Sequence, residues 1–107
     1  MILGFDLDGT YAADLKVFSR IAQVCIDAGH TCIMVTNRCE QDRVFVEDLI
    51  DRRMPVLFSC GKPKREVAEA AGYYVQVWIE DNPILVELGA AGMNEVGFFV
   101  DGHKYQG

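Results

Sequence analysis

The stretch Ile2-Leu3-Gly4-Phe5-Asp6-Leu7-Asp8-Gly9-Thr10 begins with an apolar run and ends in two acids, a glycine and a threonine. The apolar run predicts a buried strand over residues 2–7. Side chains alternate along a strand, so Asp6 and Asp8 are expected on the same side where the strand ends. Gly9 then permits a backbone turn that a Cβ would obstruct.

Two carboxylates at this spacing repel each other and raise each other's pKa unless a cation lies between them. Such a pair suits phosphoryl chemistry, because one carboxylate can attack phosphorus while the other transfers a proton and Mg²⁺ neutralises charge. A plain turn is the alternative, since Asp and Gly are frequent in turns.

The size of the chain predicts one domain over residues 1–107. Ten basic against sixteen acidic residues give a net charge of −6. No block of Lys or Arg predicts a surface for nucleic acid or for an anionic membrane. Neither a signal peptide nor an apolar stretch of the ~20 residues needed to span a bilayer is found, so the sequence predicts a cytoplasmic protein.

The four cysteines are Cys25, Cys32, Cys39 and Cys60. None forms a C-x-x-C pair, and their spacing fits no common zinc pattern. We therefore predict four reduced thiols, as is usual in a cytoplasmic protein. The role of Cys39 and Cys60 stays open, because each lies in an expected active-site loop.

Strands and helices are predicted to alternate along the chain, which favours a parallel sheet covered by helices on both faces. The predicted strands cover residues 2–7, 32–36, 56–58, 75–79 and 96–100. The predicted helices cover residues 14–28, 40–52, 63–71 and 82–92, with a frayed tail at 101–107. Chemistry in such a sheet gathers beyond the carboxyl ends of the strands.

The loops at that edge carry unusual residues. Thr36-Asn37-Arg38 follows the second strand, where a hydroxyl and helix-opening amides can bind an anion. Lys62 precedes Pro63 after the third strand, a position where the helix dipole disfavours a cation unless it neutralises a phosphate or carboxylate. A solvated loop lysine is the alternative, and Lys64 could substitute for Lys62.

Glu80 and Asp81 directly follow the fourth strand, and packing does not explain two adjacent acids there. With Asp6 and Asp8 they place up to four carboxylates around one crevice. Such a cluster needs a hard cation, and oxygen ligands favour Mg²⁺.

Taken in chain order, these groups of residues at the strand ends resemble the four motifs of the haloacid dehalogenase (HAD) superfamily. The run from Asp6 to Thr10 is similar to motif one and Thr36 to motif two. Lys62 is similar to motif three, and the pair Glu80-Asp81 to motif four. The chain departs from the usual pattern at Tyr11 and at Glu80, and Glu87 is the one candidate for a further downstream acid. Response-regulator receivers share the architecture, but they need an Asp at the end of the third strand, where Ser59 and Cys60 stand.

The resemblance implies a Rossmann-like three-layer α/β sandwich without a cap domain, with a five-stranded parallel sheet in the order 5-4-1-2-3. It also implies a Mg²⁺-dependent phosphatase. Asp6 would be the nucleophile and Asp8 the general acid and base. Metal ligands would come from Asp6, the carbonyl of Asp8 and Asp81, with Glu80 orienting the shell. The residues expected around the substrate phosphate are Gly9, Thr10, Thr36, Asn37 and Lys62.

Two other functions stay open: a nucleic-acid end-processing phosphatase, and a catalytically idle HAD-fold binding or regulatory protein. The spacing leaves no room for a cap after Thr10 or between Thr36 and Lys62. An open site loses the selection that a closing lid provides. We therefore expect a phosphorylated substrate that is itself macromolecular, or a neighbouring subunit that acts as the lid.

Overall fold

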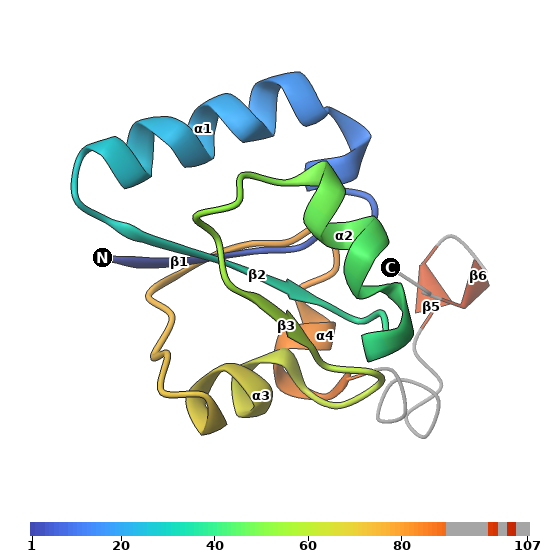
Figure 1. The fold of residues 1–107 in the computed structure, drawn as a ribbon. Coiled ribbons are helices and arrows are strands. Elements are labelled where there is room, and N and C mark those ends of the chain that lie inside the picture. Colours follow the sequence, from blue (N-terminus) through green and yellow to red (C-terminus); the bar gives the residue numbers. More distant parts are fainter. Residues whose placement is uncertain (90–98, 101–102, 105–107) are drawn as a thin grey trace.

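The computed structural model describes residues 1–89, 99–100 and 103–104. Strands and helices alternate over residues 1–89, as the sequence predicts (Figure 1). The elements, in chain order, are β1 (Ile2–Phe5), η1 (Tyr11–Ala13), α1 (Leu15–Asp27), β2 (Thr31–Thr36), η2 (Glu40–Asp42), α2 (Arg43–Leu49), β3 (Val56–Phe58), α3 (Lys64–Ala70), β4 (Val77–Ile79) and α4 (Ile84–Glu87).

The main sheet has four parallel strands in the order β3-β2-β1-β4. At the carboxyl end of β1, Phe5 lies between Met34 of β2 and Ile79 of β4. The side chains that follow these three strands therefore meet at one edge of the sheet, which is the edge predicted to carry the chemistry.

The expected five-stranded sheet in the order 5-4-1-2-3 is not matched. In place of a fifth strand of this sheet, β5 (Phe99–Val100) pairs antiparallel with β6 (His103–Lys104) in a separate two-stranded sheet. The rest of the predicted fifth strand and of the predicted frayed tail lies outside the described residues.

Helices cover both faces of the four-stranded sheet (Figure 1). On one face, Ala22 of α1 and Val46 of α2 pack with Phe5 and Met34. On the other face, Ala68 of α3 packs against residues of β2, including Ile33. The two faces of β2 are thus both buried, which explains the continuous apolar run Cys32-Ile33-Met34-Val35.

The first predicted helix is confirmed with small changes at its ends. The Asp14 carboxylate accepts a hydrogen bond from the amide of Val17 at 3.2 Å and so caps the N-terminus of α1. Gly29 follows the last turn with a φ of +94°, a conformation that glycine adopts without strain. The predicted helix over residues 40–52 is shorter than expected, because it divides into η2 and α2 and ends at Leu49.

The start of α3 differs from the prediction by one residue, and the difference matters for the site. Pro63 has a φ of −59° and a ψ of 130°, so it is the N-cap and not the first helical residue. Lys64 then begins the helix. Pro83 likewise is the N-cap of α4, one residue after the predicted start of that helix at residue 82, and its predicted end at residue 92 lies outside the described residues.

No helix among the described residues is long and apolar enough to cross a membrane.

Candidate active site

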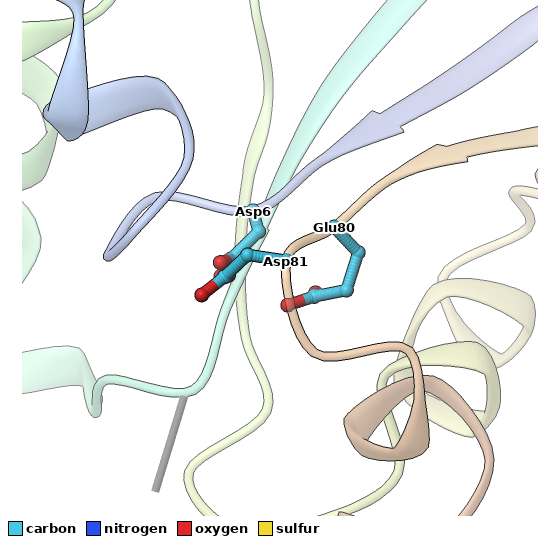
Figure 2. A group of neighbouring side chains, drawn as sticks. All are labelled: Asp6, Glu80 and Asp81. Atoms are coloured by element: carbon cyan, nitrogen blue, oxygen red, sulfur yellow. The ribbon is translucent and has the colours of Figure 1, made fainter. Parts of the chain in front are cut away.

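Three carboxylates gather at the carboxyl ends of β1 and β4 (Figure 2). Asp6 directly follows β1, and its amide donates to the carbonyl of Ile79 at 2.9 Å, which extends the pairing of the two strands by one residue. Glu80 and Asp81 directly follow β4. One carboxylate oxygen from each of the three residues lies within 4.8 Å of the others, so the predicted acidic cluster forms without the side chain of Asp8.

A buried lysine neutralises this cluster. The Nζ atom of Lys64 lies 2.7 Å from Oδ1 of Asp6 and 2.5 Å from Oε2 of Glu80. Its side chain is 0% exposed, and those of Asp6 and Glu80 are 3% and 2% exposed. A fully buried lysine is rare in proteins unless it is paired with opposite charge, as Lys64 is here.

The sequence favoured Lys62 and kept Lys64 as the alternative, and that preference is wrong for the contact with Asp6, which Lys64 makes. Lys62 is exposed on the loop after β3. The error comes from the one-residue shift at Pro63, because the first residue of α3 faces the sheet edge and the residue before Pro63 faces solvent. Burial of Lys64 is the signal that separates the two lysines, and the sequence does not carry it.

Thr10 links Asp6, which follows β1, to Asp81, which follows β4. Its hydroxyl lies 3.1 Å from Oδ1 of Asp81 and 3.3 Å from Oδ2 of Asp6, and it accepts from the amide of Asp81 at 3.2 Å. Gly9, with a φ of +80°, lies so close that a Cβ would overlap the Asp81 carboxylate. These two residues, predicted to contact the phosphate, here hold Asp81 against Asp6.

Burial and the neighbouring Asp81 raise the pKa of Asp6 to about 8, although Lys64 acts in the opposite direction. Burial would also raise the pKa of Asp81, but hydrogen bonds from Asp6 and Thr10 outweigh it and lower that pKa. Burial and the neighbouring carboxyl group thus both disfavour a negative charge on Asp6.

A hard cation would fit this arrangement, because it would offset the negative charge of carboxylates that lie within 4.8 Å of one another. The donor set is made of carboxylate oxygens, which Mg²⁺ prefers in proteins. Asp6 and Asp81 are the residues that would hold the ion. Glu80 lies beside them, with one oxygen on Lys64 and the other accepting from the amide of Asn82 at 3.2 Å.

Asp8 lies apart from the cluster and pairs with an arginine that the sequence prediction missed. Its two carboxylate oxygens accept from Nε and Nη2 of Arg38 at 2.9 and 3.0 Å. The paired carboxylate raises the pKa of Arg38. Arg38 also lies 3.5 Å from Asp42 and stacks over the ring of Phe45. The side chain of Asp8 is 47% exposed, so it can reach a ligand from solvent.

Thr36 and Asn37, the residues after β2 that were predicted to lie around the phosphate, form hydrogen bonds with backbone amides of the protein. The Thr36 hydroxyl is fully buried and accepts from the amide of Arg38 at 3.2 Å. The carbonyl oxygen of the Asn37 side chain accepts from the amide of Gly61 at 2.9 Å. Both side chains stabilise the loop that presents Arg38, and Asn37 joins it to the loop after β3.

A disulfide between Cys39 and Cys60 joins the same two loops, with a Cα–Cα distance of 4.6 Å. The prediction that all four cysteines are reduced is therefore wrong for this pair and holds for Cys25 and Cys32. Motif spacing along the chain could not show the pairing, because it depends on β2 and β3 being neighbours in the sheet. The signal in the sequence was that each cysteine lies a few residues beyond one of these strands.

Comparison with protein-family models, with curated proteins and with solved structures finds no match to this chain. A function must therefore be argued from the chemistry of the site. The site has a buried, lysine-paired Asp6 beside two further acids, and apart from that cluster an Asp8 whose carboxylate is oriented by Arg38.

Proposed function

We propose that this protein is a Mg²⁺-dependent phosphomonoester hydrolase of the HAD type that works through a phospho-aspartyl intermediate. The observation that carries the proposal is the group formed by Asp6, Glu80, Asp81 and the buried Lys64. In this group Asp6 would serve as the nucleophile, Lys64 would supply a fixed positive charge, and the carboxylate oxygens would hold the metal ion.

Asp6 would attack phosphorus with a carboxylate oxygen and form an aspartyl phosphate as the substrate oxygen leaves. When bound between Asp6 and Asp81, Mg²⁺ would supply positive charge to the phosphoryl oxygens. Lys64 would add a second fixed positive charge beside the phosphoryl group, and such preorganised charge stabilises the transition state of phosphoryl transfer. In this role Lys64 replaces Lys62 of the sequence prediction.

Asp8 would donate a proton to the leaving oxygen and then take one from the water that attacks the aspartyl phosphate. The bidentate contact with Arg38 fixes the orientation of the Asp8 carboxylate. Arg38 is therefore a positioning residue for this proton transfer.

The short connections on either side of the site favour a bulky substrate. Between Thr10 and α1 the chain forms only the short turn η1. The interval between Thr36 and Lys64 is taken up by η2, α2 and β3, so neither place holds a folded lid. A phosphate carried on a macromolecule would cover the site with its own surface, and a neighbouring subunit could do the same.

The test is hydrolysis of phosphorylated metabolites, nucleotides, oligonucleotide ends and phosphopeptides, with and without Mg²⁺. Asp6→Asn is the matched control, because it keeps the shape of the side chain and removes the nucleophile. Activity of wild type that disappears in the variant supports the proposal. Absence of turnover across the panel, together with no Mg²⁺-dependent change in melting temperature, would favour the idle HAD-fold protein.

A further inference from the structure

The Cys39–Cys60 disulfide joins the two loops on which the candidate site depends. Cys39 comes three residues after Thr36, in the loop that presents Arg38 to Asp8. Cys60 comes four residues before Lys64, in the loop that leads into α3. The bond therefore joins the loop that carries Arg38 to the loop that precedes Lys64.

Hydrogen bonds alone make a weaker link between these loops. The amide of Ser59 donates to the carbonyl of Thr36 at 2.8 Å, close to the strands. Further out, the amide of Gly61 donates to Asn37 at 2.9 Å. Within the segment 61–63, the amide of Lys62 donates to the carbonyl of Ser59 at 2.9 Å, and Gly89 packs against the backbone; the disulfide adds a covalent link to these weaker contacts.

The bond is open to attack from solvent. Cys60 is exposed and Cys39 is partly exposed, whereas the unbridged Cys32 is 2% exposed. Cys60 also has a φ of +47°, a left-handed conformation that residues with a Cβ adopt at a cost in free energy. Release of the bond removes one covalent restraint on Cys60 in that conformation.

We propose that Cys39–Cys60 is a site of reversible thiol–disulfide exchange with a dithiol reductant, and that the oxidised form is the active one. A thiolate of the reductant attacks Sγ of Cys60, forms a mixed disulfide and releases Cys39 as a thiolate. The second thiol of the reductant then displaces Cys60. The protein disulfide gains two electrons and two protons, and the dithiol leaves as a disulfide.

Reduction frees Cys60 to leave its left-handed conformation and loosens the segment before Lys64. The charge of Lys64 is useful to the reaction only where it lies against Asp6. A displacement of about 1 Å at such a group can lower the rate by about a hundredfold. The effect on turnover rests on the proposed phosphatase function, whereas the exchange itself does not.

The experiment compares oxidised protein with protein reduced by dithiothreitol. Alkylation after unfolding should find two thiols in the first and four in the second. We expect reduction to lower the melting temperature by roughly 10 °C and kcat/KM by about tenfold or more. The double variant C39S/C60S should match the reduced protein and ignore dithiothreitol, while C25S should respond like wild type.

Equal melting temperature and equal kcat/KM in the two states would overturn the proposal, and so would a response to dithiothreitol in C39S/C60S. If no state hydrolyses any substrate, the phosphatase proposal fails by itself. Amide hydrogen exchange over residues 59–64 then decides the exchange site. Faster exchange in the reduced form supports it, and identical exchange overturns it.

Discussion

Lys64→Met is the substitution that tests the candidate site most directly. It keeps most of the volume of a fully buried side chain and removes the charge that faces Asp6 and Glu80. Removal of one partner from a buried ion pair destabilises a protein by about 3–5 kcal/mol, because the other charge stays buried without compensation. For a chain of this size that loss lowers the melting temperature by roughly 12–20 °C.

Lys62→Met is the matched control, because Lys62 is two residues away and exposed. A surface substitution of this kind changes stability by about 0.5 kcal/mol or less. A second variant separates folding from catalysis. Lys64→Met combined with Glu80→Gln leaves no unpaired charge on Glu80, so it should regain at least about half of the lost stability. It should still lack turnover, because the charge beside Asp6 is absent.

Thermal melting and steady-state kinetics of the four proteins decide the matter. The reasoning is refuted if Lys64→Met melts like wild type, or if Lys62→Met causes the larger fall in kcat. It is also refuted if the double variant recovers full activity, since the lysine would then serve only to balance Glu80.

Four further outcomes are expected. In metal-free protein the free energy of unfolding should fall as pH rises from about 4 to about 8, because folded Asp6 keeps a proton that the unfolded chain releases; melting curves in EDTA should show this slope in wild type and lose it in Asp6→Asn, and an unchanged slope would contradict the raised pKa. Activity should require Mg²⁺ and be poorly supported by Ca²⁺, which prefers a larger shell of ligands; full activity in EDTA would remove the metal from the mechanism. Gly9→Ala should weaken Mg²⁺ binding, measured by calorimetry, because its Cβ would overlap Asp81 at a φ of +80°; binding as in wild type would show that Asp81 is not a ligand. Arg38→Lys should lower kcat and alter the pH profile of kcat while KM changes little, because the two-pronged contact with Asp8 is lost; a rise in KM alone would instead place Arg38 on the substrate.

The class of fold could be predicted from hydrophobic patterning and glycine positions. The apolar runs at β1 and β2 are continuous because both strands are buried, and that signal is local. The prediction of a fifth strand in the main sheet was wrong because the pairing of a strand is not a local property. An apolar run such as Val96–Val100 does not say which strand it will pair with, and a nearby hairpin partner can replace a distant sheet edge.

Within the site, the acids at strand ends were predictable and their partners were not. Asp6, Glu80 and Asp81 converge because parallel strands bring their carboxyl ends to one edge, a rule of topology. The choice between Lys62 and Lys64 depended on which residue begins α3, and helix boundaries are uncertain by more than one residue from sequence alone. Arg38 and the Cys39–Cys60 bond depend on contacts between loops, which no local pattern encodes.

The central position of β1 has a consequence for how the chain acquires its structure. The hydrogen bond of Thr10 with Asp81 spans 71 residues, and that of Ile2 with Gln76 spans 74. Ribosomes add roughly 5–20 residues per second, so Asp6 is made on the order of ten seconds before Glu80 and Asp81, which complete the acidic cluster. During that interval one edge of β1 has no strand to pair with, although Leu3 and Phe5 already need burial. A nascent chain that stops short of β4 is therefore expected to aggregate. When β4 is added, it covers the open edge of β1 and brings Glu80 and Asp81 to Asp6.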